Sequence, residues 1–571
     1  LIMIIIREVS VSIKRSIVSR PTILTLAIAS ALAGQVVWAE ESESIELDVV
    51  KVTGNTITPE LNSVTAEQIE KLQATDLQDL FSQSPEVTIG GGPGFAQKLY
   101  VRGIEDQLLN ITIDGAQQAT RQFHHAGRIS IEPELLKRVE VNAGAGNALS
   151  GPGALGGSVK FVTKDPEDML KPGENFGGLV KGMFSSNTDS FKTSTTLFGK
   201  LTEDWSGMVS YTQSDVDNYE DGNGDEVSGT EADQEYLFAK VVGHLTDSQT
   251  VRLSYENHKD EGDRTQRPQW IFSPPPAGAP ANRGNLIYPI DSDRKTATFN
   301  YELNPLDNAY VDLALTLYNT ETEFFQDGFF GPFTGTGEST GFDLRNTSIL
   351  GMHEITYGVD YRKDESSADG DGENYKDESK VKGVYLQDDI QLTDALLLTA
   401  GLRYDVGLNF HFTDNWSVFA SYAEAFKGPL AQDAFKLGFT TQAVDLKPEK
   451  AENIEFGVAY DSATWFGSAK AYRSEIKDVI GVSGTVGPAR NIFDNLGDLE
   501  SDGYILHDFY TQWRPSLSED VRITLTVQNI FDKNYIDHAS VADFTGLPGY
   551  GLVRGYNEPG RDVRLSVAWQ F

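Results

Sequence analysis

The segment Arg121-Gln-Phe-His-His-Ala-Gly-Arg128 carries the side chains best suited to binding a charged or metal-containing molecule. Two of the chain's eight histidines, His124 and His125, are adjacent here, with Arg121 and Arg128 on either side. Neutral imidazole is a good ligand for haem iron and other transition metals, and guanidinium groups pair with carboxylates. If the segment is a strand, the two histidines point to opposite faces, so at most one reaches a given axial position. The alternative is that these side chains make hydrogen bonds between two parts of the protein.

Patterns that would support catalysis are absent from the sequence or incomplete. The chain has no cysteine, which excludes disulfides, thiolate metal sites and a cysteine nucleophile. The glycine-rich stretch 144–157 lacks the lysine and following helix of a phosphate-binding loop. Asp221-Gly-Asn-Gly-Asp-Glu226 matches a calcium loop only in part, and a solvated acidic loop is the alternative. We expect no catalytic residue, no resident metal and no cofactor, and the net charge of −37 disfavours nucleic acid as a partner.

The last ten residues indicate which elements position these side chains. From Asp562 to Phe571, apolar side chains alternate with polar or small ones, as in a strand with one apolar face. With 39% hydrophobic residues and a mean hydropathy of −0.32, the chain is too polar for a bundle of membrane helices. Strands of a membrane β-barrel need only about 9 to 11 residues each, half of which are polar. The sequence therefore favours an antiparallel membrane β-barrel.

Composition divides the chain into four parts. Residues 1–39 have basic residues, an apolar run and Val37-Trp-Ala39, which are typical of a secretory signal peptide, and residues 40–60 follow as a linker. Residues 61–168 predict a small α/β domain with a helix at 66–81 and strands at 98–102, 110–114, 138–141 and 158–162. Residues 172–571 predict the barrel, whose tight turns alternate with long connections at 214–233, 259–291, 320–339, 364–379 and 427–450.

A series of motifs in a fixed order links both domains to one known family. The α/β domain contains Leu99-Tyr-Val-Arg-Gly103, Ile111-Thr-Ile-Asp-Gly115, Pro133-Glu-Leu-Leu-Lys-Arg-Val-Glu-Val141 and the glycine-rich stretch 144–157. The barrel region adds Tyr422-Ala-Glu-Ala-Phe-Lys-Gly-Pro429, Leu446-Lys-Pro-Glu-Lys-Ala-Glu-Asn-Ile-Glu-Phe456 and Asn529-Ile-Phe-Asp-Lys-Asn-Tyr535. In this order the motifs resemble those of the TonB-dependent outer-membrane transporters.

The resemblance implies an α/β plug inside a barrel of the outer membrane of a Gram-negative bacterium. It implies a monomer that contacts outer-membrane lipid, binds an iron chelate and is driven by the periplasmic partner TonB. The TonB-contacting segment would be the short apolar stretch Leu47, Asp48, Val49, Val50, Lys51 and Val52. Such a stretch can add a strand to a partner's sheet edge. The alternative is that it forms the first strand of the plug.

The ligand implied by the resemblance is a siderophore or haem. Haem-transporting members usually have a further histidine in the outer loop that corresponds to 427–445, and this loop has none. It instead offers Phe435 and Phe439 as apolar contacts, while Arg102 is expected to be a structural plug residue. Two other functions stay open, a passive diffusion porin and a surface receptor or adhesin that does not transport.

One feature departs from the family pattern. The resemblance implies 22 strands, but the turns allow only about 18 to be counted. Two places account for the shortfall: near residue 405 one strand runs directly into the next, and near residue 503 the start of one family strand is joined to the end of a later one. A smaller closed barrel is topologically possible, because an even number of strands is missing.

Overall fold

The computed structural model describes residues 63–570 with gaps. The larger gaps are 273–285, 402–404, 412–415, 428–447, 462–465, 478–508, 514–520 and 535–552, and shorter ones include 121, 123–124 and 145–147. The expected signal peptide, linker and TonB-contacting segment therefore lie outside the described residues, and the expected domain boundaries stay predictions.

The α/β domain begins with two short helices whose first turns are capped by side chains. Helix α2 (Ala66–Leu72) follows Thr65, which forms a reciprocal capping box with Gln68, and helix α3 (Leu77–Phe81) begins after Asp76, whose side chain accepts a hydrogen bond from the Asp79 backbone N–H. The helical stretch predicted at 66–81 consists of these two helices, because Gln73 adopts a left-handed conformation with φ of 51° that ends α2.

Two small sheets complete this domain. Their strands are β1 (Ser63–Thr65), β2 (Val87–Gly90), β3 (Lys98–Val101), β4 (Ile104–Glu105), β5 (Asn110–Ile113), β6 (Ala116–Gln117), β7 (Leu136–Ala143) and β8 (Gly157–Thr163). One sheet has the order β1-β7-β8-β5-β6 and the other the order β2-β3-β4. Buried Leu99, Ile111, Val139, Val159 and Phe161 share one apolar core with the two helices. The four strands predicted for this domain are confirmed.

The remaining strands follow one another around a barrel. They are β9 (Phe176–Ser185), β10 (Ser190–Lys200), β11 (Trp205–Val216), β12 (Ala232–Thr246), β13 (Gln249–Thr265), β15 (Ile287–Leu303), β16 (Asp312–Gly328), β17 (Gly331–Leu350), β18 (His353–Gly370), β19 (Glu373–Thr393), β20 (Leu396–Gly401), β21 (Asp405–His411), β22 (Trp416–Lys427), β23 (Glu449–Asp461), β24 (Phe466–Lys477), β25 (Phe509–Trp513), β26 (Val521–Gln528) and β28 (Asp562–Gln570).

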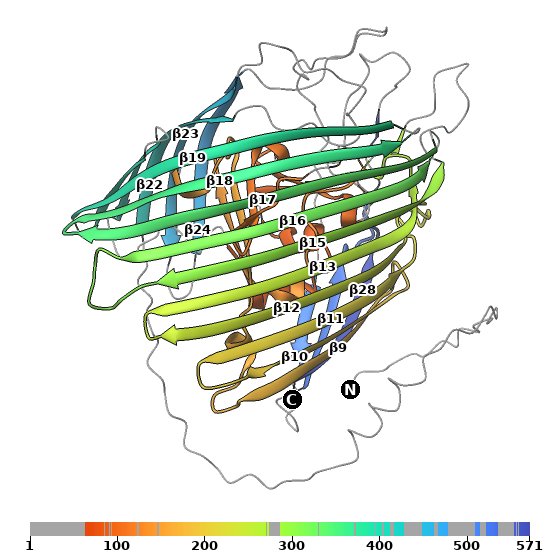
Figure 1. The fold of residues 1–571 in the computed structure, drawn as a ribbon. Coiled ribbons are helices and arrows are strands. Elements are labelled where there is room, and N and C mark those ends of the chain that lie inside the picture. Colours follow the sequence, from red (N-terminus) through yellow and green to blue (C-terminus); the bar gives the residue numbers. More distant parts are fainter. Residues whose placement is uncertain are drawn as a thin grey trace. The chain divides into compact units, whose positions relative to one another are not determined.

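The strand order is that of a closed barrel in which these 18 strands are antiparallel neighbours and β9 pairs with both β10 and β28 (Figure 1). Among the described residues, paired positions are defined for each neighbouring pair except β24 and β25. The 18 strands found among the described residues agree with the predicted count of about 18. At the expected break near residue 405, β20 and β21 pair directly as antiparallel neighbours, with Gly401 opposite Asp405. The break near residue 503 lies outside the described residues.

The wall has an apolar outer face and a polar inner face. In β28, Val563, Leu565, Val567 and Trp569 are exposed, whereas Arg564 and Ser566 between them are buried. Alternation of this kind places one set of side chains against lipid and the other in the lumen. Within the described part of the chain, no helix has the length and apolar character needed to cross a bilayer.

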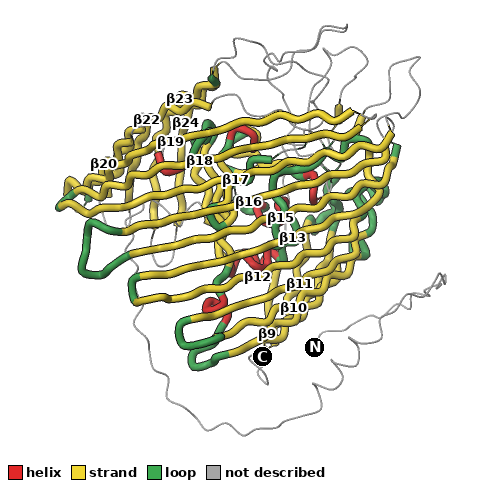
Figure 2. The backbone as a smooth tube through the Cα atoms, in the orientation of Figure 1, coloured by secondary structure: helices red, strands yellow, loops and turns green. Residues whose placement is uncertain are grey.

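The small α/β domain lies inside the barrel as a plug. Hydrogen bonds or ion pairs join it to strands spread around the ring: Lys240 of β12 contacts Asp114, Arg294 of β15 contacts Gln118, Arg362 of β18 contacts Gln117, Glu455 of β23 contacts Arg102, and Arg564 of β28 contacts Asp79. Figure 2 shows the short red helices of the plug surrounded by the yellow strands of the wall.

Two of the predicted long connections are instead strands. The regions 320–339 and 364–379 belong to the hairpins β16–β17 and β18–β19, in which β17 has 20 residues and β19 has 21. These lengths are about twice what a transmembrane strand requires, so the hairpins extend beyond the bilayer. Their acidic and glycine-rich composition suggested loops, but backbone hydrogen bonds between strands form regardless of side-chain polarity.

Candidate ligand-binding site

The structure describes only part of the predicted ligand-binding set. His125 and Arg128 are described, whereas Arg121, His124, Phe435 and Phe439 lie outside the described residues, as do Leu47 to Val52. The site can therefore be built from the surroundings of His125 and Arg128, which lie at the end of the plug near the connection that follows β13.

His125 is buried in an aromatic environment. It is 5% exposed, and its ring meets that of Phe324 on β16 edge-on with centroids 5.6 Å apart. Phe324 also stacks with Phe95 of the plug, with centroids 6.4 Å apart, and both belong to an apolar cluster with Ala96, Ala126 and Ile290. Burial, followed by the positive charge of Arg267, holds the pKa of His125 well below its ordinary value. The imidazole is therefore neutral at neutral pH, which is the form that binds metals.

Arg128 makes hydrogen bonds within the plug. Its Nε donates to the Gln118 carbonyl at 2.9 Å and its Nη1 donates to the Asp106 carbonyl, and the residue is 7% exposed. These bonds hold together segments of the plug that are separate in sequence. A role for Arg128 in ligand binding stays a prediction, although two of its donors already serve the plug backbone.

Arg264, near the end of β13, is a charged residue at this site that the sequence analysis did not single out. Its side chain is fully buried, its Nη2 donates to Asp260 at 2.9 Å, and its guanidinium carbon lies 5.2 Å from the centre of the Phe95 ring. Gly262 provides the necessary space, because a Cβ there would lie 2.2 Å from Nη1 of Arg264. The alternation of strand residues places 260, 262 and 264 on one face, but no sequence pattern shows that Phe95 lies opposite them.

The segment after Arg264 covers the same end of the plug. Gln269 is 2% exposed, and its Nε2 donates to the Ala96 carbonyl at 2.7 Å. Within the plug, the Gly127 N–H donates to the Phe95 carbonyl at 2.8 Å. A Cβ at Gly127 would lie 2.3 Å from the Gln97 carbonyl oxygen, so only glycine fits this close approach. The plug segments that carry Phe95 and His125 are thereby held together beneath the β13 connection.

Arg102 joins the plug to the opposite part of the wall. Its Nη2 lies 2.6 Å from Glu455 on β23 and 3.0 Å from Glu86 of the plug, and its side chain is 5% exposed. Two carboxylates therefore surround one buried guanidinium. This geometry gives Arg102 the position expected of a structural plug residue.

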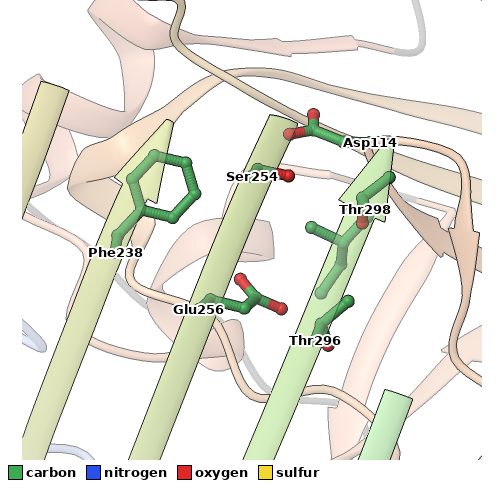
Figure 3. A pocket seen from close by; sticks show the side chains of 7 residues that line it. Asp114, Phe238, Ser254, Glu256, Thr296 and Thr298 are labelled. Carbon is green, nitrogen blue, oxygen red and sulfur yellow. The ribbon is translucent and has the colours of Figure 1, made fainter. Parts of the chain in front are cut away.

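A cavity lies between the plug and the wall next to a buried ion-pair network. It is lined by Asp114 and Ile113 of the plug and by wall side chains including Glu256, Thr296 and Thr298 (Figure 3). The two carboxylates of its lining already have partners, because Glu256 accepts a hydrogen bond from Tyr236 at 2.6 Å and Asp114 pairs with Lys240 at 3.3 Å. The cavity therefore belongs to the interface that holds the plug.

The acidic turn at 221–226 is organised by hydrogen bonds. Asp221 Oδ1 accepts from the backbone N–H groups of Asn223 and Asp225 at 2.8 and 3.2 Å, and its Oδ2 accepts from Asn557 at 2.6 Å. In the part of the chain that the structure describes, no group of three or more acidic or histidine side chains is arranged to hold a metal ion.

A β-barrel whose lumen is filled by an α/β plug defines the class of plugged barrel receptors. The family model of the TonB-dependent receptor plug domain matches residues 55–158, and that of the TonB dependent receptor-like β-barrel matches residues 237–503. Together these matches span well over half of the chain, and the chain belongs to the TonB-dependent receptors, a family of outer-membrane β-barrels that transport ligands and are not enzymes.

Several relatives resemble the chain over most of its length. The "Heme transporter BhuA" of Brucella ovis is 27% identical and covers 92% of this chain and 93% of its own. A "Hemin receptor" of Yersinia pestis is also 27% identical, over 67% of this chain and 62% of its own.

Solved structures share the fold. The FrpB iron transporter from Neisseria meningitidis has a TM-score of 0.76 at 20% identity and covers 89% of this chain and 98% of its own. The Serratia marcescens hemophore receptor HasR, solved with its hemophore HasA and heme, has a TM-score of 0.71 at 16% identity. The match covers 89% of this chain and 98% of the HasR chain.

Proposed function

We propose that the protein imports an iron chelate, either haem or a siderophore, across the outer membrane with energy supplied through TonB. The observation that carries the proposal is a neutral, buried histidine within an aromatic cluster, at one end of a plug that fills a barrel. Imidazole binds transition metals, and aromatic rings pack against the apolar surface of a chelate. The relatives named as heme or hemin proteins support the same ligand class.

TonB contact is proposed for Leu47 to Val52. A short apolar segment can add a strand to the edge of a partner's sheet, so that backbone hydrogen bonds supply much of the affinity. A pull on this segment would load the plug from its N-terminal side, where β1 and α2 are its first described elements. Ligand import would then require this segment, whereas ligand binding would not.

The proposed function is tested by growth of cells under iron limitation with a single chelate supplied at a time. Cells with the intact protein should grow on at least one chelate, and deletion of residues 46–52 should abolish growth on it while cell-surface binding of the chelate persists. His124→Ala and His125→Ala show whether either histidine contributes. Growth that is unaffected by the deletion would indicate passive diffusion, and binding without growth for the intact protein would indicate a receptor that does not transport.

A further inference from the structure

Arg264 is a buried cation whose hydrogen-bonding capacity is only partly used. One of its donors is taken by Asp260 at 2.9 Å, but Nε and Nη1 are buried without a hydrogen-bond partner among the described residues. Buried donors of a charged group that lack partners cost free energy. A guanidinium in this state can still donate N–H groups to an anion.

The local charge also favours an anion. The positive charge of Arg264 is paired with the carboxylate of Asp260. The second oxygen of that carboxylate already accepts a hydrogen bond from Gln234 at 2.6 Å. Arg267 adds another positive charge close enough to lower the pKa of His125. An incoming carboxylate would therefore lie near the positive charges of both Arg264 and Arg267.

Aromatic and imidazole groups lie directly beside these donors. The Arg264 guanidinium lies over the Phe95 ring, Phe95 stacks with Phe324, and Phe324 contacts the His125 ring. The site thus combines an anion receptor, an apolar aromatic wall and a metal-binding imidazole. A flat aromatic metal chelate with an ionised carboxylate at its edge matches all three.

We infer that Arg264 is the carboxylate-binding residue of the ligand site, and that the ligand class is a ferric porphyrin with free carboxylates. This inference rests on the proposed function, which leaves haem and siderophore open, and it selects the porphyrin. Asp260 holds the guanidinium in place, and Gly262 leaves room for it.

Two probes that differ only at the carboxylates test the inference. Ferric protoporphyrin IX has two free carboxylates, and its dimethyl ester has none. Binding of each to the purified full-length protein in detergent is measured by absorbance and by quenching of tryptophan fluorescence. The variants are Arg264→Gln, Arg264→Lys, Gly262→Ala and the control Lys259→Gln, which removes one charge from an exposed position on the same strand.

Arg264→Gln should weaken binding of the diacid by about 10- to 100-fold and leave binding of the ester unchanged, because it removes a charge-assisted hydrogen bond. Arg264→Lys should lose less, since it keeps the positive charge but not the guanidinium donors. Gly262→Ala should weaken diacid binding without removing any charge, because the added methyl group displaces the guanidinium. Lys259→Gln should bind both probes as the unmodified protein does.

Three results would overturn the inference. Arg264→Gln could bind the diacid as tightly as the unmodified protein does, or it could lose affinity equally for the diacid and the ester. The third result is that the unmodified protein does not bind the diacid. Variants are compared only when they melt at the temperature of the unmodified protein, and Arg264→Lys replaces Arg264→Gln if the latter does not fold. None of these results decides import, which is measured separately by growth on other chelates.

Discussion

Arg102 of the plug and Glu455 of the wall, 353 residues apart in the sequence, form an ion pair whose nitrogen and oxygen atoms are 2.6 Å apart. Glu86, on the plug itself, completes the coordination of the guanidinium at 3.0 Å. The buried guanidinium of Arg102, held by two carboxylates, fixes the plug against β23. Loss of this guanidinium leaves uncompensated negative charge in the lumen.

Arg102→Met should loosen the plug more than Glu455→Gln does. The arginine variant leaves two carboxylates without a cation, and breaking such a buried pair costs about 3 to 5 kcal/mol. The glutamine variant still leaves Glu86 to neutralise Arg102. The measurement is passive entry of a large hydrophilic dye into liposomes that contain each variant. Equal leakage of the two variants would contradict a shared role for Glu86.

Lys240→Met should lower the free energy of unfolding by about 3 to 5 kcal/mol. Lys240 is 3% exposed, and its Nζ lies 2.8 Å from Asp165 and 3.3 Å from Asp114. The substitution leaves Asp114 without this cation and Asp165 with Arg252 alone, at 3.0 Å. Lys259→Met, on an exposed position of the next strand, serves as the matched control and should change stability by less than about 0.5 kcal/mol. Urea unfolding in detergent measures both, and an equal effect of the two variants would contradict the prediction.

Helix α3 should become less stable as the pH rises from about 4 to 6. Burial and then the charge of Asp79 raise the pKa of Asp76 from 3.8 to about 6, so the folded state holds a proton that the unfolded chain has already released over this range. For a single proton, the stability of α3 can change by no more than about 1.4 kcal/mol per pH unit. Hydrogen exchange of the α3 amides, corrected for intrinsic rates, measures it.

Asp76→Asn should flatten this pH dependence, whereas Glu67→Gln, which removes an exposed carboxylate from α2, should not. An unchanged slope in Asp76→Asn would show that another group titrates.

Ionisation of Asp79 has the opposite effect on stability, which it increases as the pH rises. Burial alone would raise the pKa of Asp79, but the Arg564 guanidinium holds this pKa below its ordinary value. The stability that the Asp79–Arg564 pair contributes is therefore present above about pH 4 and is lost below it.

The contribution of His125 to binding of a ferric porphyrin should fall less between pH 7.5 and 5.5 than that of a histidine with an ordinary pKa. A free imidazole becomes protonated below about pH 6.5 and loses metal affinity. Burial and the charge of Arg267 keep the pKa of His125 well below that value, so this ring takes up a proton less readily than a free imidazole. The ratio of affinities of the unmodified protein and His125→Ala is measured by absorbance titration at each pH. A ratio that falls about tenfold per unit below pH 6.5 would contradict the prediction.

The alternating sequence of β28 determined its apolar and polar faces, because side chains of a strand point to opposite sides whatever the strand packs against. The turns determined the number of strands, and the plug strands were recognisable by their motifs. The loops predicted from composition at 320–339 and 364–379 are wrong, because these acidic and glycine-rich residues form strands of long hairpins. Polarity signals contact with water, and a strand that extends beyond the bilayer is in water too.

The sequence also identified His125 as a candidate, since adjacent histidines in a plug are visible without a structure. Only the tertiary structure placed Arg264 over Phe95 and beside the His125 cluster, and only it showed that Arg128 donates to the plug's own backbone. Local periodicity specifies which face of a strand a residue occupies. Which residue lies opposite depends on how the strands close around the plug, and that relation is set by contacts between residues far apart in the chain.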